Sequence, residues 1–178
     1  MADQTVGEVM RSFDDFESVV PQAFRCTNEQ MHTLQVNVGY MCNLACRHCH
    51  LACSPKRTEM MSKDTMLACL AAYERGGFSS MDITGGAPEM HPDYEWFLGE
   101  VHAAGIKPIC RTNLCILNEP DYARFARLYA DYDVTVMASV PYFSPRNVDK
   151  IRGGGVFEGT VTALRRLNEL GIGTDHAG

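Results

Sequence analysis

TLQVNVGYMCNLACRHCHLAC, residues 33–53, joins an expected strand to a loop that is unusually rich in metal-binding side chains. Residues 33–40 contain several β-branched side chains and show no helical periodicity, so they predict a strand. The loop that follows carries Cys42, Cys46 and Cys49 in the spacing C-x3-C-x2-C, together with two histidines and a further cysteine. Soft ligands at this density indicate a metal or iron–sulfur centre directly after the strand.

The chain beyond this loop repeats the order of strand, then helix. Further strands are predicted at 81–84, 107–112 and 134–140. Helices are predicted from Ser62 to a Gly76-Gly77 stop, at 93–104, from Pro120 to about 131, and at 157–170. Serial strand–helix units predict an α/β fold with a parallel sheet and right-handed crossovers, either a barrel or an open sheet.

Unusual segments follow each of the expected strands. They are the cysteine loop, TGGAPE (84–89), RTN (111–113) and SVPYFSPRN (139–147). In both candidate architectures the chemistry lies at the carboxyl ends of the strands, so we expect these segments to form one site. Residues 1–30 are expected to be a separate N-terminal helical segment, and residues 31–178 to be the main domain.

Composition narrows the function classes. The 178 residues are 46% apolar and 21% charged, which is typical of an ordinary globular chain. The net charge of −6 gives no electrostatic reason to expect binding to nucleic acid or to an anionic membrane. No targeting peptide or membrane span is recognised in the sequence, so we expect a cytoplasmic protein. In a reducing compartment the eight cysteines are expected to be ligands or free thiols rather than disulfides.

Three centres fit the cysteine loop. The string CRHCH, residues 46–50, is typical of covalent haem attachment, but that attachment normally follows export. A zinc site usually takes its ligands as two separated pairs, although Cys53 or His50 offers a fourth ligand here. A [4Fe–4S] cluster on three thiolates would keep one iron open for chemistry. The position of the loop after the first strand favours the cluster.

Residues in the remaining segments could have either a structural role or a role in binding a ligand. Gly85 and Gly86 fit a simple turn, and they equally allow a polar ligand to approach the backbone. Arg152 lies in a glycine-rich stretch and suits recognition of a carboxylate. Asn113 and Ser139, at expected strand ends, fit either structural hydrogen bonds or ligand contacts.

With these motifs in place, the sequence from about residue 33 to residue 172 resembles the radical S-adenosylmethionine (SAM) superfamily. The strings CRHCH, SPKRTEMM, TGGAPEMHP and SVPYFSPRNVDKIRGGGVFE look most like the arsenosugar-biosynthesis radical SAM proteins, also called radical SAM/Cys-rich domain proteins. The resemblance implies a partial (βα)6 barrel, of which about four βα units are present. It also implies a [4Fe–4S] cluster on Cys42, Cys46 and Cys49, with SAM bound at the open iron.

In that family the reduced cluster cleaves SAM to methionine and a 5′-deoxyadenosyl radical. The resemblance implies a small-molecule substrate, which in the arsenosugar case is a methylated trivalent arsenical, and a reductant such as flavodoxin or ferredoxin. No side chain is assigned a catalytic role by the resemblance. Contacts to SAM are implied for His48, Gly85, Gly86, Glu89, Asn113, Ser139 and Arg152.

Two departures from the family pattern stand out. The loop that commonly reads Gly-Gly-Glu is Gly85-Gly86-Ala87 here, so Glu89 is the expected substitute for the acidic group. The sequence GIGTDHAG, residues 171–178, stands where a fifth strand would begin, which predicts a truncated product, a fragment or one part of a split protein. The alternative function is therefore an inactive iron–sulfur or zinc-binding remnant.

Overall fold

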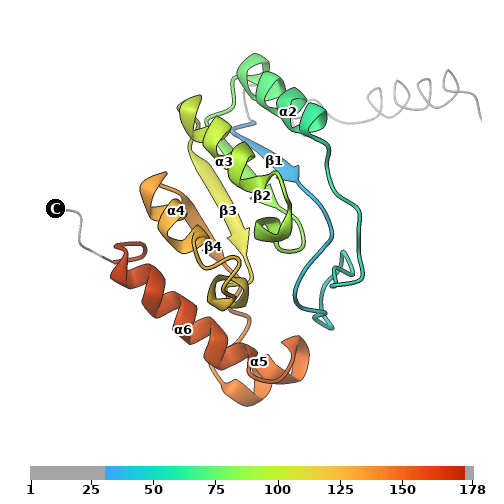
Figure 1. Cartoon of the computed structure of the whole chain (residues 1–178), viewed down its shortest axis with the longest axis vertical. Coiled ribbons are helices and arrows are strands. Elements are labelled where there is room, and N and C mark those ends of the chain that lie inside the picture. The colour runs from blue at the N-terminus through green and yellow to red at the C-terminus, as the bar shows by residue number, and fades with distance from the viewer. Residues whose placement is uncertain (1–30, 175–178) are drawn as a thin grey trace, which may run out of the picture. The chain divides into compact units, whose positions relative to one another are not determined.

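A parallel sheet of four strands organises the chain. The computed structural model describes residues 31–174, and the predicted helical segment at 1–30 lies outside them. The strands are β1 (Thr33–Asn37), β2 (Ser80–Thr84), β3 (Pro108–Thr112) and β4 (Thr135–Ala138). Their order in the sheet is their order in the chain, and every neighbouring pair is parallel (Figure 1). The predicted α/β fold is confirmed.

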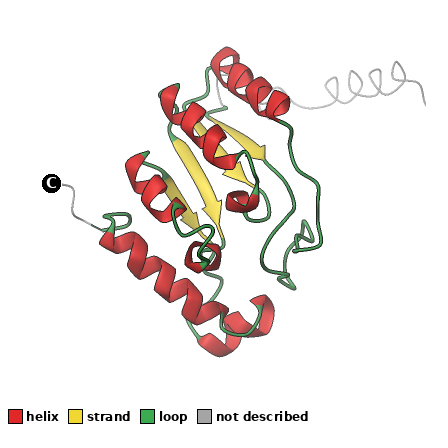
Figure 2. Cartoon of the chain, viewed as in Figure 1, coloured by secondary structure: helices red, strands yellow, loops and turns green. Residues whose placement is uncertain are grey.

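Helices alternate with these strands (Figure 2). They are α2 (Lys63–Gly76), α3 (Tyr94–Ala103), α4 (Phe125–Asp131), α5 (Pro145–Arg152) and α6 (Val156–Glu169), with short 3₁₀ turns η3 (Pro88–Met90) and η4 (Cys115–Asn118). The Ser62 hydroxyl caps α2 by accepting from the Thr65 N–H, and Gly77 ends the helix in the left-handed conformation, at φ +67°. Within residues 31–174, no helix has the length and apolar character needed to cross a bilayer.

The sequential strand order decides the layer arrangement. Right-handed crossovers that all advance in one direction place their helices on the same face of the sheet, as in the wall of a (βα) barrel. The core fills the space between the sheet and these helices, with Met81, Ile83, Tyr94 and Phe97 all fully buried. Side chains alternate along a strand, so the other face of the sheet remains for a site.

The structure differs from the sequence prediction between the strands β3 and β4. Pro120 does not begin a helix: the N–H groups of Tyr122 and Phe125 each bond to the carbonyl three residues earlier, which makes successive turns, and α4 begins at Phe125. The predicted helix start is therefore wrong by five residues. Tight turns follow η4 before α4 begins, and η4 itself packs against α6.

Helix α5 lies where the sequence pattern predicts no helix, between the fourth strand and the last helix. It begins with Pro145 in its first turn after the extended residue Ser144, which is a recognisable helix start. Gly153, at φ +120°, separates α5 from α6. The two helices pack together, and the short α5 brings its last residue, Arg152, to the ends of the strands.

Candidate functional site

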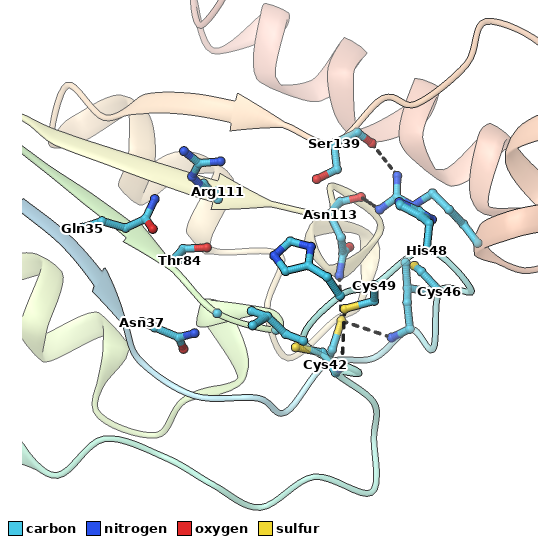
Figure 3. A pocket seen from close by; sticks show the side chains of 17 residues that line it. Gln35, Asn37, Cys42, Cys46, His48, Cys49, Thr84, Arg111, Asn113 and Ser139 are labelled. Carbon is cyan, nitrogen blue, oxygen red and sulfur yellow. Dashed lines mark hydrogen bonds between the residues drawn. The ribbon is translucent and has the colours of Figure 1, made fainter. Parts of the chain in front are cut away.

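A cavity of about 390 Å³ lies at the carboxyl ends of the strands (Figure 3). This volume falls in the range of small-molecule binding sites. All of the predicted site residues except Glu89 line it: Cys42, Cys46, His48, Cys49, Gly85, Gly86, Asn113, Ser139 and Arg152. The four unusual segments of the sequence therefore meet in one place, as parallel strands require.

The thiols of the cysteine loop receive backbone and side-chain donors. The Leu44 N–H lies 3.4 Å from Cys42 Sγ, and the Asn113 amide nitrogen lies 3.5 Å from the same sulfur. The Cys53 N–H donates to Cys49 Sγ at 3.4 Å. Burial raises the pKa of the Cys42 thiol, whereas the two N–H donors favour its thiolate. Such donors to sulfur are what a thiolate ligand requires around it.

The glycine turn after β2 packs directly against the start of the cysteine loop. The Gly86 N–H donates to the Gly39 carbonyl at 2.9 Å, and the Ala87 N–H donates to the Met41 carbonyl at 2.8 Å. A Cβ atom on Gly86 would stand 2.1 Å from the Met41 oxygen, so only glycine fits there. The structural reading of this turn is therefore supported by geometry, while both glycines also line the cavity.

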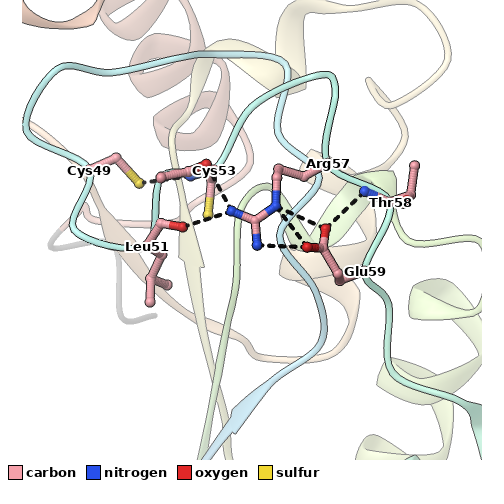
Figure 4. Close-up of polar contacts among 7 residues, drawn as sticks. Cys49, Leu51, Cys53, Arg57, Thr58 and Glu59 are labelled. Atoms are coloured by element: carbon pink, nitrogen blue, oxygen red, sulfur yellow. Dashed lines mark hydrogen bonds and ion pairs between the residues drawn. The ribbon is translucent and has the colours of Figure 1, made fainter.

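The far end of the cysteine loop is fastened by Arg57 (Figure 4). Its Nη1 donates to the carbonyl oxygens of Leu51 and Ala52, both at 3.3 Å, and its Nε donates to the Glu59 carboxylate at 2.9 and 3.0 Å. The guanidinium also lies 4.7 Å from the centre of the Tyr40 ring. These contacts hold the loop closed over the buried Cys53. Burial, and then the neighbouring Cys49, raise the pKa of the Cys53 thiol to about 12.

Arg152 serves the ends of two strands. Its Nη2 donates to the Asn113 carbonyl at 3.1 Å, and its Nη1 donates to the Ser139 carbonyl. Arg152 is only 4% exposed. The Asn113 side chain is engaged as well, because its amide nitrogen donates to the side-chain Oδ1 of Asn43 at 2.7 Å. Arg152 thus joins α5 to the ends of β3 and β4, a structural task that the sequence did not suggest.

Glu89 is the one predicted site residue outside the cavity. It is 2% exposed, Tyr129 donates to its Oε1 at 2.8 Å, and its Oε2 has no hydrogen-bond partner among the described residues. Burial raises the pKa of this carboxyl group, although the Thr112 and Tyr129 hydroxyls counteract the rise. Glu89 in η3 contacts Tyr129 of α4 and does not line the cavity with the other residues for which SAM contacts are predicted.

Sequence reasoning missed four polar residues that line the cavity from the strands themselves: Gln35, Asn37, Thr84 and Arg111. The signal was present as alternation, since QVN, DIT and RTN each place polar residues two positions apart. Of the cysteines without a motif, Cys115 is not among the lining residues of the cavity, and it donates to the Val156 carbonyl at 3.3 Å. Cys110 accepts from the buried Tyr94 hydroxyl at 2.9 Å.

The chain belongs to the radical SAM superfamily, whose family model matches residues 36–177. Members of this superfamily are enzymes that bind a [4Fe–4S] cluster and SAM.

Among curated relatives, the chain is 33% identical over 136 residues to the mycofactocin maturase MftC of Mycobacterium ulcerans, covering 75% of this chain and 35% of that protein. It is 23% identical over 145 residues to a probable GTP 3′,8-cyclase of Methanococcus maripaludis, covering 80% of this chain and 47% of that protein. The chain therefore spans about a third to a half of the length of these relatives.

A solved structure supports the fold. Streptococcus suis SuiB bound to S-adenosylmethionine superposes with a TM-score of 0.65 at 21% identity, covering 80% of this chain and 32% of that one. SuiB bound to its precursor peptide SuiA gives the same TM-score at 22% identity, covering 80% and 31%. The four-stranded parallel sheet is thus the fold of a partial radical SAM barrel.

Proposed function

We propose that Cys42, Cys46 and Cys49 hold a [4Fe–4S] cluster and that this cavity is the SAM-binding centre of a radical SAM enzyme. The observation that supports it most is the meeting of the three thiols with the Gly85-Gly86 turn in one cavity. Over residues 31–174, no three His, Cys, Asp or Glu side chains converge closely enough to hold a single metal ion. A lone zinc ion draws every ligand to about 2.0–2.3 Å, whereas a cluster takes each thiolate on a different iron.

The residues of the cavity fit such a group. When bound, the reduced cluster supplies the electron that cleaves the S–C5′ bond of SAM, giving methionine and the 5′-deoxyadenosyl radical. N–H donors from Leu44 and Asn113 would stabilise the Cys42 thiolate, and Gly85 and Gly86 line the same cavity. His48 lines the same cavity, where an adenine ring would have a planar neighbour. The protein's task is to bind, orient and exclude water.

Anaerobic reconstitution tests this assignment. We expect a brown protein with near-stoichiometric iron and sulfide, which releases 5′-deoxyadenosine from SAM when reduced by flavodoxin, ferredoxin or dithionite. Cys49→Ala should lose the cluster, and Cys69→Ala, which removes a half-buried thiol of α2 outside the cavity, should keep it. A colourless protein that retains zinc contradicts the proposal. A full cluster with no SAM cleavage favours the inactive remnant instead.

For the substrate, we propose a methylated trivalent arsenical, to which the deoxyadenosyl group is joined in arsenosugar biosynthesis. The support is the resemblance of the cysteine loop and of residues 139–158 to those proteins, together with one soft ligand in the cavity. Cys53 is a buried thiol that lines it, and trivalent arsenic prefers soft sulfur ligands. Incubating the reconstituted protein with SAM, reductant and a dimethylated trivalent arsenical should give a deoxyadenosyl–arsenic product by mass spectrometry.

A second candidate is modification of a peptide. The similarity to mycofactocin maturase and the fold shared with peptide-bound SuiB favour it. The two candidates separate in one assay, because a peptide substrate would gain or lose mass while the arsenical stayed unchanged. Formation of the arsenic product by the wild type, and its loss in Cys53→Ala with the cluster retained, would exclude the peptide reading.

A further inference from the structure

The face of the sheet that is turned away from the helices carries a fixed ion pair. Arg111, on β3, binds the Asp82 carboxylate of β2 through Nε at 2.9 and 3.0 Å and through Nη2 at 2.7 Å. Gln35, on β1, donates to the same carboxylate at 2.9 Å. The register places Gln35 beside Asp82, so three adjacent strands contribute to one network. The Asp82 side chain is only 7% exposed and that of Arg111 is 42% exposed.

The network leaves one edge of Arg111 without a protein partner. Nε and Nη2 face Asp82, whereas Nη1 makes no hydrogen bond to any residue in the described part of the chain. Arg111 lines the cavity together with Asn37 and Thr84, and Figure 3 shows these side chains over the strands, apart from Cys46 and Cys49. Asp82 holds one edge of the guanidinium in a fixed orientation, and the other edge is free to contact a ligand. A guanidinium held in this way can bind a second anion with its free edge.

The charge of the cavity lining agrees with this. It contains two arginines and two histidines, and no Asp or Glu of residues 31–174 is among the lining residues. The whole chain, in contrast, carries a net charge of −6. Arg152 is only 4% exposed and binds backbone carbonyls through Nη1 and Nη2, whereas the Arg111 side chain is 42% exposed, so Arg111 is the arginine that a ligand can reach more easily. An anionic ligand would therefore meet no nearby carboxylate except Asp82, whose charge is already compensated.

We propose that Arg111 binds a carboxylate, an oxyanion with two equivalent oxygens, on the second substrate of this site; of the two candidate substrates, the peptide carries such a group. This rests on the proposed function, because the second substrate is the one that would receive the radical. SAM itself has a carboxylate, but the cysteine loop lies at the strand exits, beside Asn113 and Ser139. Arg111 lies on β3 two residues before Asn113, which follows the end of that strand, so Arg111 is farther from the exit. Asp82 is the positioning residue that holds the guanidinium plane, and Gln35 supports Asp82.

Nuclear magnetic resonance of the arginine Nε–Hε groups tests the site in the full-length chain. The probes are acetate and dimethylarsinate, each titrated at constant ionic strength. We expect a saturable shift of the Arg111 resonance with either probe, while the resonance of Arg124 stays unchanged. Arg124 is a matched reference because it also binds a carboxylate, that of Glu95, but on the exposed surface.

Variants sharpen the result. Arg111→Gln should weaken probe binding at least tenfold, measured by calorimetry, and Arg124→Gln should leave it unchanged. Arg111→Gln also leaves the buried Asp82 without its cation, so the double variant Asp82→Asn/Arg111→Gln keeps amide partners in place of the ion pair and guards against misfolding. Equal shifts of all arginines, or undiminished binding in both variants, overturn the inference.

Two further experiments distinguish a failure of this inference from a failure of the proposed function. If saturating SAM abolishes acetate binding to the reconstituted protein, the oxyanion site belongs to SAM and the inference is wrong. A chain that assembles the cluster and cleaves SAM but shows no probe binding at Arg111 overturns this inference alone. A chain that binds the probes at Arg111 but assembles no cluster leaves the oxyanion site standing and overturns the proposed function.

Discussion

Gly86 and Met41 lie so close together that a Cβ atom on residue 86 would stand 2.1 Å from the Met41 carbonyl oxygen. The next residue, Ala87, donates its N–H to that same oxygen at 2.8 Å. The turn after β2 therefore fixes the position of Met41, the residue before Cys42. The position of the cysteine loop thus depends on Gly86, which follows a different strand.

Gly86→Ala should displace the cysteine loop. Relieving the clash requires a backbone shift, because the nearest atoms are backbone atoms, and such overpacking costs about 1–3 kcal/mol of unfolding free energy. We expect lower stability in urea unfolding and a lower iron content after reconstitution. Gly154→Ala is the control, since a Cβ there meets no atom within 4 Å. Full iron content in Gly86→Ala would show that the loop adjusts independently of the turn.

Arg152→Met should destabilise the junction of α5 with the sheet. The change leaves the Asn113 and Ser139 carbonyls without their donor, at about 1–3 kcal/mol for each buried group left unsatisfied. Urea unfolding measures the loss, and Arg165→Met, at an exposed position of α6, is the control. If stability is unchanged and only SAM affinity falls, Arg152 serves the ligand, as the sequence predicted.

Glu89→Gln should alter the pH dependence of stability. Burial raises the pKa of Glu89 in the folded chain above the usual value near 4.3, so its stabilising effect is complete below that value and declines as pH rises toward the folded pKa. Glutamine carries no such charge, so the variant should lose less stability than the wild type between pH 4.5 and 8. Urea unfolding at several pH values provides the comparison, with Glu100→Gln as an exposed control on α3. Parallel curves for the wild type and Glu89→Gln would contradict the assignment.

Asp82→Asn should have the opposite pH signature. Burial raises the pKa of Asp82, but the hydrogen bonds from Arg111 and Gln35 outweigh it and hold the pKa below its usual range. The ion pair therefore stabilises the fold above about pH 3.9, and this contribution is lost as pH falls through the lowered pKa. At pH 7 we expect the variant to be less stable by about 1.5–3 kcal/mol, the usual value of a hydrogen bond to a charged group.

The matched control for that experiment is Asp131→Asn. It breaks the exposed pair of Arg127 with Asp131 on α4, which should be worth well under 1 kcal/mol. The difference between wild type and Asp82→Asn should shrink in acid, whereas a difference that persists at low pH would assign the effect to packing. The same variant should also weaken acetate binding, because Arg111 loses the partner that fixes its plane.

The local sequence was sufficient for the four strands, for most of the helices and for the meeting of the motifs in one site. Strand and helix patterns, read with the rule that parallel strands share one exit edge, predicted that the cysteines, the Gly85-Gly86 turn, Asn113 and Ser139 would meet, and they line one cavity. These features depend on short-range propensities and on topology. The start of α4 and the existence of α5 escaped, because turns between elements depend on what they pack against.

Only the tertiary structure decided what individual side chains do inside that arrangement. Glu89 faces Tyr129 rather than the cavity, Arg152 binds strand-end carbonyls, and Arg111 binds Asp82 with one edge while the other edge lines the site. The sequence cannot assign these roles, since a charged residue finds its partner among residues that are far away in the chain. The spacing of the cysteines is a local property, so the sequence alone shows it. The direction of the Arg111 guanidinium, in contrast, is set by the fold.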